Sequence, residues 1–97
     1  MIETKFHIEL SIKTPNDFTC YGKFTLGNNR KFVSNLFQKM KGNKKADEKA
    51  ILQLEFVETR NGLPVNIQII SCSLEQLAEN CKTITKEIFK FANLEKS

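Results

Sequence analysis

The dipeptide Asn61-Gly62 lies between two apolar-rich segments, residues 50–58 and 65–72, and constrains the fold more than any other feature of the chain. Asn-Gly is typical of a two-residue type I′ turn, in which both central residues need positive φ. The flanking segments are therefore expected to be the strands of a β-hairpin. Pro64 has no N–H to donate to a β ladder, so we expect it at a strand start or on a sheet edge. The side chains predicted to face the core are Leu52, Leu54, Phe56, Val65, Ile67 and Ile69.

A second hairpin is predicted nearer the N-terminus. Residues 4–13 and 18–26 both alternate between apolar and polar side chains, which is typical of half-buried strands. Pro15, in the TPND sequence between them, fits the second position of a turn. The side chains expected to point inward are Phe6, Ile8, Leu10 and Ile12 in the first segment, and Phe18, Cys20, Gly22, Phe24 and Leu26 in the second.

Two helices are predicted from apolar stripes and capping residues. Asn28 and Asn29 supply an N-cap after Gly27, and Gly42 is the expected C-cap of the helix that follows. The last helix is expected to begin after Ser73, because Gln76 completes a capping box with it. The buried stripes are Phe32, Val33, Leu36, Phe37 and Met40 in the first helix, and Leu77, Cys81, Ile84, Ile88 and Phe91 in the second.

The resulting element order is β-β-α-β-β-α over one small domain, residues 1–97. A chain of this length usually forms a single domain. We expect an α+β fold, a two-layer sandwich with a four-stranded, mostly antiparallel sheet and both helices on one face. The strand order stays open, because the first helix could bring the second hairpin beside either strand of the first.

Hydropathy and cysteine content narrow the class of protein. No apolar run is long enough to cross a bilayer, and the N-terminus lacks the basic head and apolar stretch of a signal peptide. Cys20, Cys72 and Cys81 form an odd set without a C-x-x-C pair, which argues against a disulfide framework. We therefore expect a soluble cytoplasmic protein with no membrane contact, whose cysteines are small core residues.

No pattern in the sequence indicates catalysis, a metal or a cofactor. The single histidine, His7, is predicted on the polar face of its strand and Cys20 on the inward face of the next, so a cysteine nucleophile lacks a base. The cysteines lack metal-ligand spacing, and no nucleotide-binding or zinc-protease motif is present. Glu9 and Glu55 could be neighbours on the sheet, which ordinary surface charge explains. We predict a non-enzymatic protein; for an enzyme, the residues to inspect first are His7, Cys20 and Tyr21.

The basic character of the chain is concentrated in residues 30–49, which hold seven positive and two negative residues in a chain of net charge +4. Arg30 and Lys31 lie in the first turn of the predicted helix, where the dipole disfavours each cation by roughly 0.3–1 kcal/mol. Unpaired N–H groups at the same place attract anions. One interpretation is a phosphate site, and the other is a solubilising surface. The residues of the candidate anion or nucleic-acid site are Asn28, Asn29, Arg30, Lys31, Lys44, Lys45 and Lys49.

The sheet face opposite the helices is predicted to be polar with apolar interruptions. Tyr21, Ile51, Val57 and Ile70 are expected on it, and Phe89 lies off the buried stripe of the last helix. These residues are either a surface covered by a partner or scattered surface hydrophobes, which are normal. The polar residues expected beside them are His7, Glu9, Ser11, Lys13, Thr19, Lys23, Thr25, Gln53, Glu55, Asn66 and Gln68.

The leading hypothesis is a small soluble protein-interaction module, a homodimer or an accessory subunit, that binds a protein partner or itself. The alternative is a nucleic-acid or phosphate-backbone-binding domain that uses residues 30–49. Lysine outnumbers arginine thirteen to two, so such binding would contact the backbone rather than read bases. Base stacking needs several exposed aromatic residues, and only Tyr21 is expected to be available.

Overall fold

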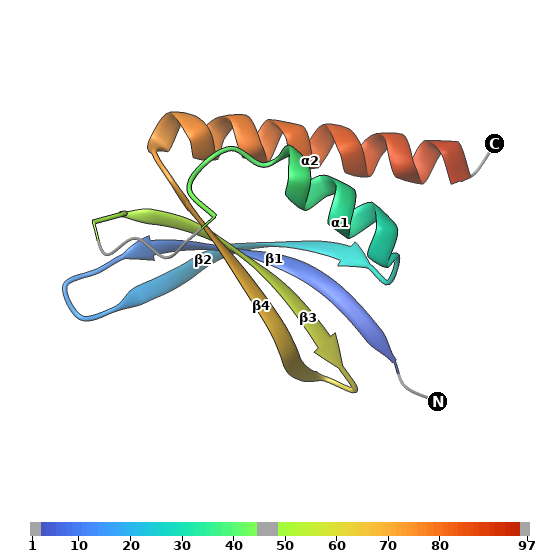
Figure 1. Ribbon diagram of the computed structural model, residues 1–97, viewed down its shortest axis with the longest axis horizontal. Coiled ribbons are helices and arrows are strands. Elements are labelled where there is room, and N and C mark those ends of the chain that lie inside the picture. The colour runs from blue at the N-terminus through green and yellow to red at the C-terminus, as the bar shows by residue number, and fades with distance from the viewer. Residues whose placement is uncertain (1–2, 45–48, 96–97) are drawn as a thin grey trace.

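A four-stranded sheet and two helices form the two layers that the sequence predicts (Figure 1). The computed structural model describes residues 3–44 and 49–95. Its elements are β1 (Thr4–Lys13), β2 (Phe18–Gly27), α1 (Arg30–Lys39), β3 (Leu52–Arg60), β4 (Leu63–Cys72) and α2 (Leu74–Glu95). The strands make one antiparallel sheet in the order β2-β1-β3-β4, and both helices lie on one side of it.

The turn between β3 and β4 has the geometry that Asn-Gly predicts. Asn61 has a φ of 52° and Gly62 a φ of 83°, and Arg60 pairs directly with Leu63. The connection through α1 places this hairpin beside β1 rather than β2, so β2 and β4 are the two edges of the sheet. Pro64 consequently lies on an edge strand, as expected.

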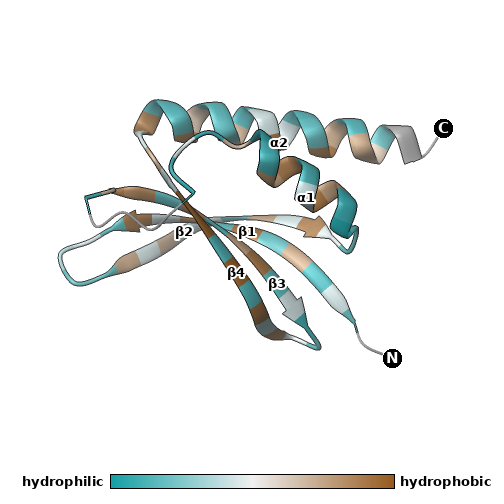
Figure 2. Cartoon of the chain, in the orientation of Figure 1, coloured by the Kyte–Doolittle hydropathy of each residue, from teal (hydrophilic) through white to brown (hydrophobic). Residues whose placement is uncertain are grey.

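The core lies between the helices and the inward face of the sheet. Ile8, Leu54 and Ile84 are completely buried there. Phe37 meets Phe56 edge to face, with ring centroids 5.2 Å apart, and this contact joins α1 to β3. Figure 2 shows the corresponding alternation of apolar and polar bands along the strands. The buried core residues are Phe6, Ile8, Leu10, Leu26, Val33, Leu36, Met40, Leu54, Phe56, Ile70, Cys72, Leu77 and Ile84.

The predicted inward face of β4 is wrong. Ile70, predicted on the outer face, is completely buried in the core, whereas Val65 and Ile67 are 50% and 51% exposed. The direct pair between Leu54 and Ile70 sets this register, because Leu54 faces the core. Alternation alone could not choose the face, since Ile69 and Ile70 put an apolar residue on each side.

A β-bulge further changes the alternation of β4. Glu58 pairs with Asn66 but Thr59 pairs with Pro64, so Val65 is an extra residue on β4. Before the bulge the register is unbroken: Gln68 pairs with the core residue Phe56 and Asn66 with Glu58, so both lie on the inward face of the sheet and their prediction on the outer face is wrong. Both stay exposed on this edge strand, where they line an open cleft together with α1 residues such as Val33 and Phe37.

A second bulge changes the predicted face of β2. Leu10 pairs with Gly22 but Ser11 pairs with Cys20, so Tyr21 is the extra residue. Cys20 therefore lies opposite an outward residue of β1 and is exposed, and its prediction as a core residue is wrong.

The first helix begins as predicted but ends differently. Asn29 is its N-cap, and Asn29 Oδ1 accepts a hydrogen bond of 2.9 Å from the N–H of Phe32. Its C-cap is Met40, so the prediction of Gly42 as C-cap is wrong. Gly42 has a φ of 130°, and a Cβ at this position would lie 2.5 Å from the carbonyl oxygen of Ser71. Glycine is needed here because the chain passes close to β4.

The second helix begins with the predicted capping box. Ser73 N–H donates to Gln76 Oε1 at 2.9 Å, and Gln76 N–H donates to Ser73 Oγ at 3.2 Å. One turn later, Asn80 is only 1% exposed, which no sequence pattern indicates. Its amide donates to the C=O of Lys41 and accepts from the N–H of Lys41, both at 2.8 Å. Asn80, on α2, therefore holds in place the segment that comes directly after α1.

Candidate interaction surface

Arg30 is a cation at the positive end of the α1 dipole, and it has a partner on β3. Its guanidinium donates to both carboxylate oxygens of Glu58, at 3.1 and 2.8 Å, and lies 5.2 Å from the ring centre of Phe6. The Glu58 side chain is 7% exposed and also accepts from Arg60 at 3.3 Å. The hydrogen bond from Arg30 lowers the pKa of Glu58 below its usual value. Arg30 therefore neutralises an inward carboxylate, which accounts for its position without an external anion.

The rest of the predicted anion site is divided among separate contacts. Asn29 Oδ1 already accepts from a backbone N–H of the first turn, so that N–H is not free for a phosphate. Lys44 lies over the ring of Phe37. Two nearby lysines outside the predicted site, Lys39 and Lys41, form ion pairs with glutamates of α2. Nucleic-acid binding by this segment stays a prediction. The other candidates are Asn28, Lys31 and Lys49, which are exposed, and Lys45, which lies outside the described residues.

The residues to inspect first for catalysis do not come together. His7 pairs with Thr25, whereas Cys20 pairs with Ser11, four residues further along β1. This separation is about 13 Å along a strand, too long for a base to activate the thiol. The Cys20 thiol instead donates to the C=O of Gly22 at 3.4 Å. Within the described ranges, no three His, Cys, Asp or Glu residues are grouped to hold a metal ion.

Glu9 and Glu55 are direct neighbours on the outer face of the sheet. They form a cross-strand pair between β1 and β3, and His7 Nε2 lies 3.8 Å from Glu9 Oε1. Burial raises the pKa of Glu55, and the negative charge of Glu9 adds to this effect. Burial lowers the pKa of His7, and the charge of Lys23 lowers it further. Gln53 Nε2 donates to Glu55 Oε1 at 2.9 Å, so these side chains form a cross-strand network on the sheet surface.

The predicted interface residues do not form one surface. Ile70 is a core residue, and Val57, although on the outer face, is only 4% exposed within a central strand. Tyr21, Ile51 and Phe89 are exposed, but they lie on β2, before β3 and on α2 respectively. The prediction of Ile70 on the outer face is therefore wrong, and an interface role for Tyr21, Ile51, Val57 and Phe89 stays a prediction.

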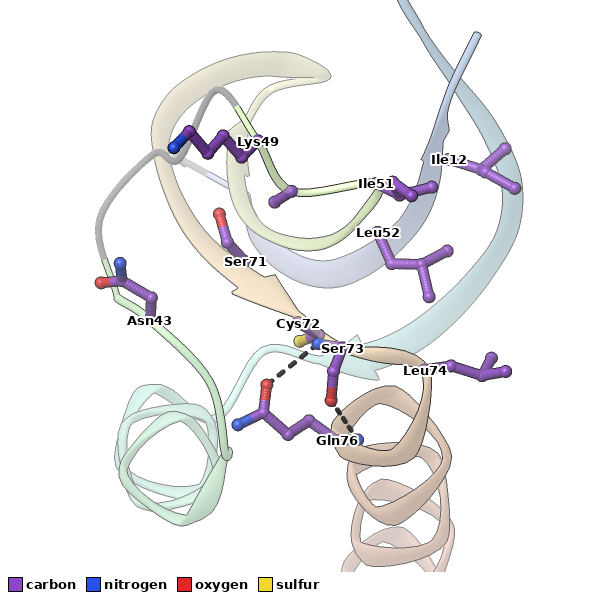
Figure 3. A pocket seen from close by; sticks show the side chains of 11 residues that line it. Ile12, Asn43, Lys49, Ile51, Leu52, Ser71, Cys72, Ser73, Leu74 and Gln76 are labelled. Atoms are coloured by element: carbon purple, nitrogen blue, oxygen red, sulfur yellow. Dashed lines mark hydrogen bonds between the residues drawn. The ribbon is translucent and has the colours of Figure 1, made fainter.

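An apolar cleft of about 670 Å³ lies where the segment before β3 approaches the start of α2 (Figure 3). Its exposed apolar residues are Ile12, Ile51 and Leu74. Two of its polar residues, Ser73 and Gln76, are hydrogen-bonded to each other through the capping box. The cleft therefore offers apolar area, while the polar groups of this cap are already satisfied.

Three exposed apolar residues lie close together in the sequence of the edge strand β4. Leu63, Val65 and Ile67 are each at least half exposed, and every residue from 63 to 68 is exposed. Of the four described strands, β4 alone has no charged residue; its sequence is LPVNIQIISC. The missing charge is visible in the sequence, but its importance depends on β4 being an edge strand.

Among the described residues, 3–44 and 49–95, nothing pairs with the main-chain groups of this edge over a short, bounded stretch. Ser71 donates its N–H to Asn43 and accepts from the Asn43 N–H, both at 2.8 Å, so its main-chain groups point away from β3. Alternate residues of an antiparallel strand point these groups to the same side, so Ile69 and Ile67 also face the open edge. Beyond the bulge, Pro64 has no N–H to donate. We call residues 66–70, between these two limits, the β4 window.

The other edge strand, β2, is protected in ways that the β4 window is not. It carries Lys23, and its register with β1 shifts at two places. Edge lysines and bulges are common protections against pairing with another chain. Within the described residues, no strand pairs with the open edge of β4, and its only partner there is the isolated bridge from Asn43 to Ser71. The β4 window is therefore the candidate interaction surface.

Comparison with known proteins adds no functional information, because no protein-family model, curated protein or solved structure matches the chain. In the part of the chain that the structure describes, neither helix is long and apolar enough to cross a membrane.

Proposed function

We propose that this protein is a non-enzymatic protein-interaction module that binds a partner chain through the β4 window. The observation that carries the proposal is an uncharged edge strand whose main chain, among the described residues, has no partner at Ile67 and Ile69. An added strand would satisfy these main-chain groups and cover the exposed side chain of Ile67. An unprotected edge strand tends to pair non-specifically with other chains. A specific partner that covers the β4 window explains why this edge lacks the usual protections.

Cysteine chemistry supports a cytoplasmic location within this proposal. Cys20, Cys72 and Cys81 are all free thiols. Burial raises the pKa of Cys72 and of Cys81, which keeps both protonated and unreactive. Free thiols persist in a reducing compartment, where proteins rarely form structural disulfides.

Site-specific photo-crosslinking in cells that express the chain tests the proposal. A benzophenone amino acid placed at Ile67 should give one discrete adduct, because this side chain would lie against the partner. The same probe at Lys82, exposed on α2, is the matched control and should give none. Adding Ile69→Lys to the Ile67 probe variant should remove the adduct, since a lysine on an edge strand disfavours pairing with another chain. Absence of an adduct from Ile67, or equal adducts from both positions, would contradict the proposal.

A further inference from the structure

We infer that the partner of the β4 window is a second copy of this chain, paired antiparallel about a two-fold axis at Gln68. This inference rests on the proposed function and specifies its partner. In such a dimer the two copies present the same edge to each other. The window is five residues long, so an axis at its central residue, Gln68, pairs the two windows along their whole length.

The main chain of the window is self-complementary under this symmetry. Ile67 of one copy lies opposite Ile69 of the other, and both residues present their N–H and C=O to the edge. Each such pair exchanges two hydrogen bonds, and the symmetry makes two pairs. Gln68 then lies opposite its own copy as a non-hydrogen-bonded pair, with side chains on the inward side of the sheet. All open main-chain groups of the window are used.

The two limits of the window select this register over its neighbours. A shift of two residues in one direction would place Ile67 opposite Ser71, whose N–H and C=O already bond to Asn43. A shift in the other direction would bring the bulged Val65 opposite Ile69. Only the register centred on Gln68 avoids both conflicts. Because the contact is isologous, the β4 windows of both copies are used up in one pairing, and assembly through them stops at a dimer.

The side chains of the window also favour a second copy. On the outer face, Ile67 and Ile69 of the two copies form apolar cross-strand pairs, which stabilise antiparallel sheets. Each chain has a net charge of +4, yet the window carries no charge, so pairing brings no like charges directly opposite. A strongly charged peptide would find no counter-charge within the window. The result would be one continuous eight-stranded sheet, with the helices of both copies on the same side.

Sedimentation velocity on purified chains tests the dimer. The wild-type chain should sediment with twice the monomer mass as concentration rises, and Ile67→Lys should sediment as a monomer. Leu74→Lys and Phe89→Lys are matched controls, because both replace exposed apolar residues elsewhere, and they should stay dimeric. Circular dichroism should show all four chains folded. A monomeric wild type, or dissociation by a control but not by Ile67→Lys, would overturn the inference.

A disulfide trap tests the register without relying on a disruptive change. Exposed Cys20 is first replaced by serine, and Gln68→Cys or Asn66→Cys is then added. Under mild oxidation Gln68→Cys should cross-link, because a non-hydrogen-bonded pair has its Cα atoms about 4.5 Å apart. Asn66→Cys should not, because the two copies of that residue lie about 13 Å apart along the strands. Equal cross-linking of both variants would overturn the register.

The two tests separate failure of the inference from failure of the proposed function. A monomeric wild type whose Ile67 probe cross-links to a different protein would overturn the second-copy inference and leave the interaction module standing. A monomeric wild type that gives no adduct from Ile67 would overturn both.

Discussion

Replacement of Asn80 by alanine should strongly destabilise this protein, because one buried amide joins α2 to the segment that follows α1. The amide accepts from Lys41 N–H and donates to Lys41 C=O, both at 2.8 Å, and its nitrogen lies 3.4 Å from Cys72 Sγ. Within the described residues, no buried side-chain nitrogen or oxygen lacks a hydrogen-bond partner. Asn80→Ala would break this complete set of hydrogen bonds.

The size of the effect follows from the contacts that are lost. A hydrogen bond of this kind contributes about 0.5–1.5 kcal/mol net, and sulfur is a weak acceptor, so the two bonds to Lys41 dominate. Truncation of a side chain that is 1% exposed also leaves a small cavity. We expect the free energy of unfolding to fall by about 2–3 kcal/mol. For a domain of this size the Tm should fall by roughly 10–20 °C.

Urea denaturation followed by circular dichroism measures this change directly. The matched control is Asn93→Ala, because Asn93 is an exposed asparagine of the same helix that donates to the C=O of Phe89, at 2.8 Å. Its effect should stay within about 0.5 kcal/mol. A similarly small loss for Asn80→Ala would refute the anchoring role. Hydrogen exchange of the Ser71 amide should also become faster in Asn80→Ala. Asn80 holds Lys41, and the chain then runs to Asn43, whose C=O accepts the hydrogen bond from the Ser71 N–H.

Three further substitutions test the charges and the close approach in the fold. Glu58→Gln should destabilise most above the ordinary carboxyl pKa, since folding lowers the pKa of Glu58, and the loss should shrink as pH falls through the lowered value. A pH-independent loss would count against this ion pair. Glu55→Gln should have the opposite sign, because folding raises the pKa of Glu55 beside Glu9. It should stabilise by about 0.2–1 kcal/mol at neutral pH, and the gain should vanish below the ordinary carboxyl pKa; urea titrations over pH measure both variants. Gly42→Ala should lower the Tm more than Gly27→Ala, because both glycines have positive φ but only the first would place a Cβ 2.5 Å from a backbone oxygen. Equal melting shifts would show that backbone strain, not this contact, sets the cost.

In the proposed function, the β4 edge is the binding surface, and the apolar cleft beside the start of α2 is not required. The helices pack on Leu54, Phe56 and Ile70, and they leave residues 63–68 of the edge strand β4 exposed. Pro64 and Asn43 limit the exposed main chain to the β4 window. A short, bounded edge can bind one strand in one register, which is more specific than an apolar face alone.

Local patterns were enough to predict the element order, both hairpins and the layer that the helices form. The β1 alternation, the Asn61-Gly62 turn and the capping box of Ser73 with Gln76 depend on residues close in the chain, so their geometry is readable from sequence. The prediction of Cys20 failed at a bulge, because the extra residue Tyr21 reverses the face of everything beyond it. The prediction of the inward face of β4 failed because Ile69 and Ile70 put an apolar residue on each side of the strand.

By itself, the sequence determined which segments become strands and helices, since periodicity and capping act over a few residues. Only the tertiary structure decided what the chemistry-bearing residues contact. Arg30 and Glu58 are 28 residues apart and no spacing rule relates them, so their ion pair arises from the crossover that lays α1 beside β3. The same strand order makes β4 an edge, and an uncharged strand becomes a binding surface only when its outer side is left without a neighbour.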